Sequence, residues 1–194
     1  MTHQQFMNAA TVAWIVFLAY WFLSAQRLKA VKKREPPWER AMQVISLGIA
    51  YLLLFSDFFR IPDLYRRVLP VTIPFQTLGL TLSFLGIAFA IWARRHLGEN
   101  WSATVTLKKD HELIRSGPYR RIRHPIYTGM LLSMFGTAMI RAEVCGFIAL
   151  AIALIAFYFK ARKEERYLIV EFGPKFAEHK TQTGMFLPRL NAGS

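Results

Sequence analysis

Cysteine and negative charge are both scarce in this sequence. Cys145 is its single cysteine, and 12 acidic residues face 25 lysines and arginines, giving a formal net charge of +13. One cysteine excludes an intrachain disulfide and a cysteine-based metal cluster. The five histidines form no i, i+4 pair and no Glu-x-x-His motif, so we expect no metal. There is also no internal repeat and no low-complexity segment.

Long apolar runs between basic clusters are what the chain does contain. Hydrophobic residues make up 54% of it and the mean hydropathy is +0.25, despite the high net charge. This combination is typical of a multi-pass membrane protein, in which a span needs roughly 20 mostly apolar residues. We predict an all-α membrane protein, one domain of residues 1–194. The first apolar run is read as a retained helix rather than a signal peptide.

Five transmembrane helices are predicted. They cover residues 8–25, 42–59, 72–93, 126–140 and 144–159. The last two are separated by Arg141, Ala142 and Glu143 alone, so they are expected to form a tight helical hairpin. Gly129 and Gly136 are expected to let the fifth helix approach the fourth closely.

The basic residues indicate an orientation. Of the 25 lysines and arginines, 21 fall in three segments, namely after the first helix, after the third helix and in the C-terminal tail. The positive-inside rule assigns these segments to the cytoplasm, which puts the N-terminus outside and the C-terminus in the cytoplasm. Anionic lipid headgroups also account for such clusters, so we predict the bilayer as a partner and no nucleic acid.

Chemically capable residues are densest at residues 117–129, where the fourth helix begins. Pro125 suits the first position of a helix, and His124 then lies near free backbone N–H groups and the positive end of the helix dipole. That position favours an anionic group of a ligand. Tyr119 and Tyr127 offer rings and hydroxyls to a planar ligand. A basic, aromatic stretch is equally ordinary at a membrane boundary, and that alternative stays open.

Two adjacent glutamates, Glu164 and Glu165, follow the fifth apolar run. Because no helix breaker occurs before Gly173, the helix is expected to continue through Phe172. Adjacent helical residues point about 100° apart, so one carboxylate is expected to turn inward, toward a cation or a hydroxyl pair. The alternative is a surface salt-bridge network with Lys160 and its neighbours.

Together these motifs resemble a known family. The motifs are His111-Glu112-Leu113-Ile114, Gly117-Pro118-Tyr119, Arg123-His124-Pro125-Ile126-Tyr127-Thr128-Gly129, Glu164-Glu165 and Phe172-Gly173. In this order and spacing they resemble the isoprenylcysteine carboxyl methyltransferase family, over roughly residues 104–190. The short five-helix chain is similar to the compact prokaryotic members.

The resemblance implies a function and a site. The methyl donor would be S-adenosylmethionine, the product S-adenosylhomocysteine, and the acceptor an apolar or prenylated carboxylate. His124, Tyr127 and Glu164 would position the reactants in a cytoplasmic pocket. The residues that the resemblance assigns to the cofactor are Thr104, His111, Glu112, Leu113, Ile114, Gly117, Tyr119, Arg123, His124, Pro125, Ile126, Tyr127, Glu164 and Glu165.

The chemistry of this methyl donor agrees with the residue types. Its adenine needs an apolar slot, which Leu113 and Ile114 can supply. Its ammonium needs a carboxylate from the Glu164–Glu165 pair, and its carboxylate needs a cation such as His124. It carries no phosphate, which agrees with the lack of a glycine-rich loop. A carboxylate acceptor is ionised near pH 7 and needs no general base, so catalysis would be mainly positioning.

Lys160 departs from the family pattern, which commonly has an arginine at this substrate-facing position. Lysine cannot grip a carboxylate in a bidentate way, so the acceptor is not specified. One alternative is a phospholipid N-methyltransferase, and another is a sterol-type reductase whose NADPH phosphate would meet Arg120, Arg121 and Arg123. A non-enzymatic transporter or scaffold would need ionisable residues within a span, and Asp57 is the candidate. The oligomeric state and the inward-facing glutamate stay open.

Overall fold

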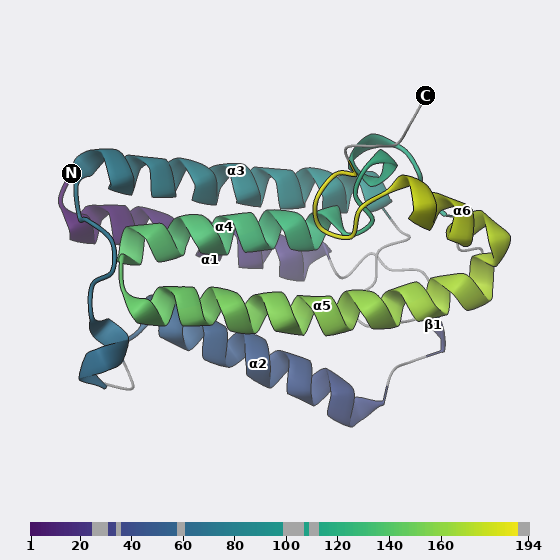
Figure 1. Ribbon diagram of the computed structural model, residues 1–194, viewed down its shortest axis with the longest axis horizontal. Helices are drawn as coiled ribbons and strands as arrows, with labels where there is room; N and C mark the ends of the chain where they lie inside the picture. Colours follow the sequence, from purple (N-terminus) through teal and green to yellow (C-terminus); the bar gives the residue numbers. More distant parts are fainter. Residues whose placement is uncertain (25–30, 34–35, 58–60, 99–106, 109–112, 190–194) are drawn as a thin grey trace.

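The computed structural model describes residues 1–24, 31–33, 36–57, 61–98, 107–108 and 113–189. In this part of the chain, five long helices lie side by side and run alternately in opposite directions (Figure 1). They are α1 (His3–Ser24), α2 (Pro37–Phe55), α3 (Ile73–Leu97), α4 (Pro125–Arg141) and α5 (Val144–Phe172). A short helix, α6 (Pro174–Gln182), follows at one end of the bundle. Helix α4 lies between α3 and α5, α1 packs on α3 and α4, and α2 packs on α5.

Short elements connect these helices. Two 3₁₀ helices, η1 (Pro62–Tyr65) and η3 (Gly117–Arg120), precede α3 and α4. The strands β1 (Val31–Lys33) and β2 (Leu107–Lys108) pair in an antiparallel fashion. The protein is therefore predominantly α-helical, as predicted, but with one small strand pair that the sequence did not predict. It joins the connection after α1 to the connection after α3, at the end of the bundle that also carries α6.

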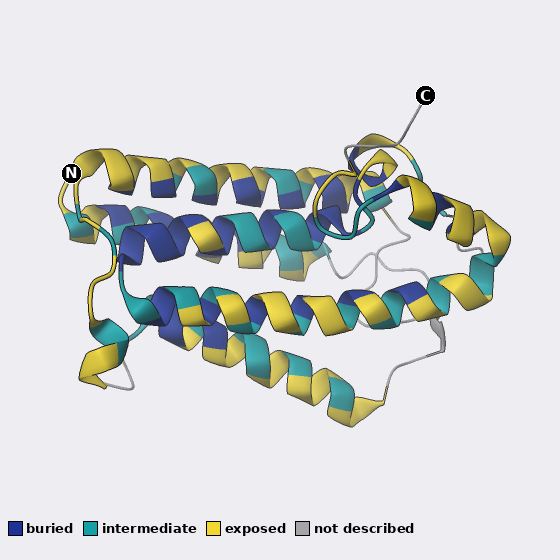
Figure 2. Cartoon of the chain, viewed as in Figure 1, coloured by how far each residue is buried: buried dark blue, intermediate teal, exposed yellow. Residues whose placement is uncertain are grey.

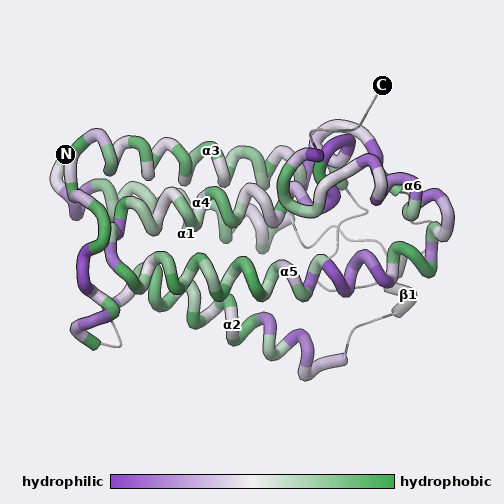
Figure 3. The backbone as a smooth tube through the Cα atoms, in the orientation of Figure 1, coloured by the Kyte–Doolittle hydropathy of each residue, from purple (hydrophilic) through white to green (hydrophobic). Residues whose placement is uncertain are grey.

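Four helices, α1, α2, α3 and α5, are long and apolar enough to cross a membrane, and the chain is a multi-pass integral membrane protein. Figure 2 shows exposed residues along the outer faces of these helices, and many of the exposed residues are apolar, as suits contact with lipid. Hydrophilic residues gather at the two ends of the bundle (Figure 3). Helix α4 has 17 residues, about 26 Å of helix, against the roughly 30 Å of a bilayer core. A fifth span thus stays a prediction.

The first two helices begin earlier than predicted. Helix α1 begins at His3 rather than residue 8, because Thr2 and Gln5 form reciprocal backbone–side-chain hydrogen bonds of 2.8 and 3.3 Å. This capping box is polar, so a search for apolar runs passes over it. Helix α2 begins at Pro37 rather than residue 42, because proline suits a first helical position. It ends at Phe55, before the predicted residue 59.

The glycines of α4 face α3. A Cβ atom on Gly129 would lie 2.6 Å from the backbone nitrogen of Ala90, and one on Gly79 would lie 2.7 Å from the carbonyl oxygen of Gly136. Side chains at these positions would force the two helices apart. The prediction that Gly129 and Gly136 admit the fifth helix is therefore wrong, because they admit the third.

The hairpin between α4 and α5 is as tight as predicted. Ala142 takes a left-handed conformation with φ of 61° and donates its N–H to Ala138, and α5 begins two residues later. Gly146 packs against Ala138. Helix α5 continues through Phe172, as expected from the first breaker, Gly173. The hairpin brings the start of α4 beside the polar second half of α5.

Candidate functional site

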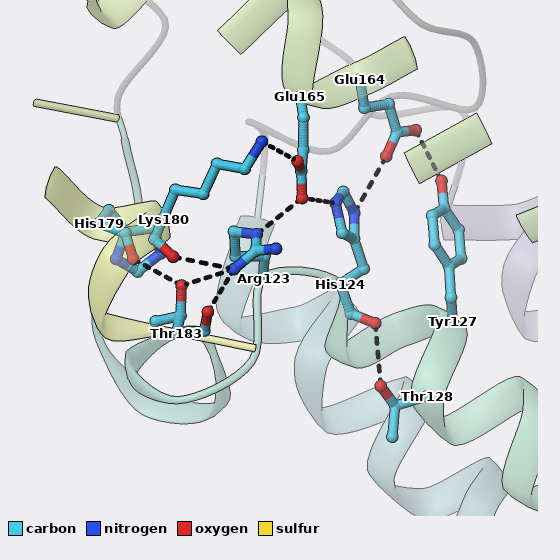
Figure 4. Close-up of polar contacts among 9 residues, drawn as sticks. All are labelled: Arg123, His124, Tyr127, Thr128, Glu164, Glu165, His179, Lys180 and Thr183. Atoms are coloured by element: carbon cyan, nitrogen blue, oxygen red, sulfur yellow. Dashed lines mark hydrogen bonds and ion pairs between the residues drawn. The ribbon is translucent and has the colours of Figure 1, made fainter. Parts of the chain in front are cut away.

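The predicted site residues meet at the end of the bundle that carries α6. In Figure 4, α5 lies on one side of the first turn of α4, and α6 with the segment that follows it lies on the other side. His124 is the residue before α4, and its imidazole lies between the carboxylates of Glu164 and Glu165. Pro125 starts the helix as predicted. The sequence-distant halves of the motif therefore form one cluster.

The imidazole of His124 is held on all sides. Its Nδ1 lies 3.3 Å from Glu164 Oε2, its Nε2 lies 3.5 Å from Glu165 Oε1, and the side chain is 6% exposed. Its ring stacks on Tyr127, with ring centres 5.5 Å apart and planes 6° apart, and meets the ring of Phe186 edge-on. Burial acts to lower the pKa of His124, but the hydrogen bonds and charges of the two glutamates outweigh it and raise that pKa above its ordinary value. The geometry therefore favours an imidazolium.

Glu164 is the more open of the two glutamates. Its side chain is 22% exposed, against 2% for Glu165. The Tyr127 hydroxyl donates a 2.6 Å hydrogen bond to Glu164 Oε1, and the Tyr127 ring is itself stacked on Phe157 at 4.8 Å. The Lys160 ammonium lies 5.7 Å from the centre of the same ring. Glu164 is thus a carboxylate held in a fixed orientation by rigid aromatic neighbours and still accessible at the surface.

Glu165 is occupied by cations of the chain itself. Arg123 Nε lies 2.7 Å from Glu165 Oε1, and Lys180 Nζ lies 2.9 Å from Glu165 Oε2. Arg123 also donates to the carbonyl oxygens of Lys180, at 3.2 Å, and of Thr183. These contacts join α5, α6 and the residue before His124 into one cross-link. The sequence left open which glutamate turns inward; Glu165 is the buried one.

The segment after α6 covers the start of α4. The backbone N–H of Arg123 donates to the Gly184 carbonyl at 2.9 Å, and the Gly184 N–H returns a 3.1 Å bond to Arg121. The Thr128 hydroxyl donates to the Phe186 carbonyl at 2.7 Å. Sequence reasoning missed this segment, together with Lys180. The Gly173-Pro174 break was read as the end of a helix, although Pro174 also starts the next one and turns the chain back.

The 3₁₀ helix η3 packs against the end of α3. Gly117 has φ of 56°, and a Cβ there would lie 2.7 Å from the His96 ring, so glycine makes room for this ring. His96 accepts or donates a 2.8 Å hydrogen bond with Ser116 and stacks on Tyr119, with centres 6.4 Å apart. Burial, followed by the charge of Glu164, raises the pKa of Tyr119. The Tyr119 phenol therefore stays protonated.

The remaining predicted residues differ in their position. Ile126 is buried in the core, while Leu113 and Ile114 are half-buried, the latter against the same core. Thr104 and the pair His111–Glu112 lie outside the described residues. Of the predicted residues that the structure describes, it therefore brings His124, Tyr127, Glu164 and Glu165 together.

Two alternatives from the sequence can be compared with the same geometry. Arg123 faces Glu165, whereas Arg120 and Arg121 are exposed, so the three arginines proposed for an NADPH phosphate do not point at a common buried position. Asp57 is 81% exposed and pairs with Arg141 at 2.6 Å. It lies beyond the end of α2, which ends at Phe55, rather than within a span.

Comparisons with known proteins agree with the resemblance in the motifs. The family model described as phospholipid methyltransferase matches residues 75–175. The cobalt-zinc-cadmium resistance protein CzcN of Cupriavidus metallidurans is 35% identical over 114 residues, which are 58% of this chain and 50% of that protein. The protein-S-isoprenylcysteine O-methyltransferase of Saccharomyces cerevisiae is 32% identical over 114 residues, 57% of this chain and 48% of that enzyme. The chain spans about half the length of these relatives.

A solved structure shares the fold. It is a eukaryotic intramembrane Ras methyltransferase, isoprenylcysteine carboxyl methyltransferase, with a TM-score of 0.54 and 23% identity over 79% of this chain and 54% of that one. The family match runs from α3 through the first residues of α6 and includes His124, Tyr127 and both glutamates. It covers more than half of the chain. The chain therefore belongs to the phospholipid methyltransferase family of membrane proteins, with isoprenylcysteine methyltransferases among its relatives.

Proposed function

We propose that this protein is an S-adenosylmethionine-dependent methyltransferase that methylates the carboxylate of an apolar, membrane-embedded acceptor. The observation that carries the proposal is the Glu164 carboxylate, held at 2.6 Å by Tyr127 and at 3.3 Å by His124 yet 22% exposed. Glu164 lies at a polar end of the bundle (Figure 3), and many of the residues exposed along the helices are apolar. A polar methyl donor and an apolar acceptor can reach such a place from opposite sides.

The residues present fit the methyl donor. Glu164 offers a partly exposed carboxylate to the ammonium group, and the Tyr127 hydroxyl fixes the orientation of that carboxylate. Glu165 is less suited to this role, because Arg123 and Lys180 already neutralise it. When bound, the methyl donor supplies an electrophilic methyl group on a sulfonium. The contribution of the chain is to bind, orient and shield the reactants.

The acceptor end is assigned to Lys160. Its ammonium lies over the Tyr127 ring, one helical turn before Glu164 on α5. A cation there attracts an anionic acceptor such as an isoprenylcysteine-like carboxylate, which is already ionised near pH 7 and needs no general base. As a point charge it holds the carboxylate less rigidly than an arginine would. The acceptor is thus expected to be chosen mainly by its apolar part.

A second candidate is methylation of a phospholipid amine, which the description of the matched family model favours. This chemistry requires the amine to lose its proton before it attacks. A protonated amine would also be repelled by Lys160. We therefore favour the carboxylate, with the amine as a distinct outcome of the test. In either case we propose five spans, with the N-terminus outside and this site facing the cytoplasm.

Binding of the methyl donor is tested by calorimetry on the full chain purified in detergent. S-Adenosylhomocysteine is expected to bind saturably and NADPH is not. Glu164→Gln is expected to weaken the binding roughly 10- to 100-fold, as expected for loss of a charged hydrogen-bond partner. Glu171→Gln, the same change two turns further along α5, is the matched control and should bind like the wild type. Absent binding, or equal binding by both variants, would refute the assignment.

The acceptor is tested in proteoliposomes with methyl-labelled S-adenosylmethionine. One preparation contains a small S-prenylated cysteine with a free carboxyl group, and the other contains phosphatidylethanolamine. We expect a base-labile methyl ester on the cysteine compound and no label on the lipid. Label on the lipid amine instead would replace the carboxylate with the second candidate, while leaving the methyl donor assignment intact.

A further inference from the structure

The charges around His124 are unevenly distributed. Glu165 has two cations of its own, Arg123 at 2.7 Å and Lys180 at 2.9 Å. Glu164 has the Tyr127 hydroxyl on Oε1 and the His124 imidazole on Oε2, and the charge of Lys160 also acts on it. The imidazole is thus a cation bound to the same carboxylate that we assign to the ammonium group of the methyl donor.

We propose that His124 is an exchangeable cation, whose imidazolium pairs with Glu164 until the ammonium of the methyl donor replaces it and the histidine releases its proton to solvent. The proposal rests on the proposed function. The Nδ1–H bond of His124 breaks, the electron pair stays on the nitrogen, and the proton is taken up by buffer. The imidazole remains in place as a neutral ring stacked on Tyr127.

The geometry favours this exchange because both oxygens of the Glu164 carboxylate are already held, Oε1 by the Tyr127 hydroxyl and Oε2 by the His124 imidazole. The imidazole is 6% exposed, so a second positive charge on Glu164 would face it with little water to screen the repulsion. The ring cannot easily turn away, since it is stacked on Tyr127 and flanked by Phe186. Moving toward Glu165 gives no new partner, because the imidazole Nε2 already lies 3.5 Å from Glu165 Oε1, and Arg123 and Lys180 hold the same carboxylate. Losing the proton is the remaining way to remove the charge.

Proton release also explains how a buried imidazolium is compatible with a cationic ligand. The free protein keeps the two glutamates neutralised, which limits the penalty for burying them. The ligand then meets a carboxylate that is already desolvated and oriented by Tyr127. By thermodynamic linkage, affinity for the ligand rises with pH as long as His124 starts out protonated, by up to tenfold per pH unit, and levels off above that range.

The test is calorimetry of S-adenosylhomocysteine binding to the full chain in two buffers of very different ionisation enthalpy, phosphate and Tris, over the range of about pH 7 to 8.5 in which both can take up a proton. The apparent enthalpy is expected to differ between the buffers by an amount that corresponds to release of up to one proton. This difference should shrink as the pH rises. His124→Gln should abolish it, because glutamine keeps hydrogen-bonding capacity and carries no charge. His3→Gln, at the opposite end of the bundle, should leave it unchanged.

The outcomes separate this proposal from the proposed function. Saturable binding with the same enthalpy in both buffers at every pH would overturn proton exchange and leave methyl donor binding intact. A lack of binding to the wild type would overturn both. A buffer dependence that persists in His124→Gln would assign the proton to another group and overturn the role of His124. Should His124→Gln fail to fold, the wild-type buffer dependence and its decline with pH decide alone.

Discussion

Each end of the bundle holds an arginine among carboxylates, and the two clusters differ in what holds their exposed carboxylate. At the end away from α6, Arg141 is 6% exposed and lies 2.6 Å from Asp57 and 3.0 Å from Glu143. It also contacts Cys145 Sγ at 2.9 Å and the carbonyl oxygen of Leu54 at 3.2 Å. All these partners belong to the end of α2 and the α4–α5 hairpin. We call this group the hairpin cluster.

The cluster at the α6 end, formed by Arg123, His124, Glu164, Glu165 and Lys180, also pairs an arginine with a carboxylate, and it adds a histidine and a lysine. Here a histidine lies between two carboxylates, and the partly exposed one, Glu164, is held by this histidine and by Tyr127, whereas the exposed Asp57 of the hairpin cluster is paired with the arginine itself. The hairpin cluster joins helix ends and has one arginine as its centre. The α6-end cluster does this through Arg123 and Glu165, and it adds Glu164 as a group that can meet a ligand. In the function that we propose, the Arg123–Glu165 ion pair supports the site and the neighbouring Glu164 carboxylate binds the ligand.

Breaking the Arg123–Glu165 ion pair should have the largest effect on stability and on ligand binding. Glu165→Gln leaves the buried Arg123 without its carboxylate, which we expect to lower the free energy of unfolding by about 3–5 kcal/mol. Binding of S-adenosylhomocysteine should be lost with it, because His124 and the segment after α6 lose their anchor. Unfolding is measured by titration with sodium dodecyl sulfate in detergent micelles, followed by tryptophan fluorescence.

A matched double variant separates the two losses. Arg123→Met combined with Glu165→Met replaces the pair by apolar side chains and should recover much of the stability, because it buries no unpaired charge. Ligand binding should stay weak, since the apolar pair cannot orient His124. Full recovery of binding in this double variant would show that the pair does not support the site.

The hairpin cluster should give a stability effect without a binding effect. Arg141→Met removes hydrogen bonds to Asp57, Leu54 and Cys145, and we expect a loss of about 2–3 kcal/mol in the free energy of unfolding. Affinity for S-adenosylhomocysteine, measured below the unfolding transition, should match the wild type. A tenfold loss of affinity would contradict the division between the two ends of the bundle.

Orientation of the binding carboxylate is tested by a smaller change. Tyr127→Phe keeps the rings of His124 and Phe157 stacked but removes the 2.6 Å hydrogen bond to Glu164. We expect roughly fivefold weaker ligand binding, about 1 kcal/mol, with little change in stability. Tyr158→Phe, on an exposed tyrosine of α5, is the control. Unchanged binding in Tyr127→Phe would mean that the hydroxyl does not orient the carboxylate.

The sequence predicted which segments are helical better than it predicted where the helices end and which helices pack against each other. Apolar runs indicated all five long helices, because hydropathy reports what a lipid-facing segment must be. It does not report polar caps, so the capping box at Thr2 and Gln5 went unseen. It also does not tell which neighbour a glycine faces. Gly129 and Gly136 read as contacts to the next helix in the chain, whereas the bundle places α3 against them.

The site was predictable where a motif is local and unpredictable where it depends on the fold. Pro125 and the continuation of α5 followed from helix rules, and they place His124 and Glu164 at one end of the hairpin. The partners of Glu165 did not follow, because Lys180 and the segment after α6 reach it only through a chain reversal at Gly173. Long-range salt bridges of this kind produce no regular spacing of residues that could be recognised in the sequence.

The smallest expected effect is on the pH dependence of stability, which tests whether His124 is a buried cation of the α6-end cluster. Because Glu164 and Glu165 raise the pKa of His124 in the folded protein, protonated His124 stabilises the fold. This contribution is fully present below the ordinary histidine pKa of about 6.5 and is lost as the pH rises through the raised value. The melting temperature of the wild type should therefore exceed that of His124→Gln most at low pH, with a difference that shrinks toward alkaline pH.

The titration of His179 is the reason for comparing the wild type with His124→Gln rather than scanning the wild type alone. Burial, with the charges of Arg115 and Arg123, lowers the pKa of His179, so its contribution has the opposite sign and is lost as the pH falls. A pH scan of the wild type alone would mix the two histidines. Subtracting the His124→Gln curve removes His179, because both proteins contain it. A difference that stays constant with pH would mean that His124 is not protonated between the glutamates, and that the α6-end cluster, like the hairpin cluster, has an arginine as its one buried cation.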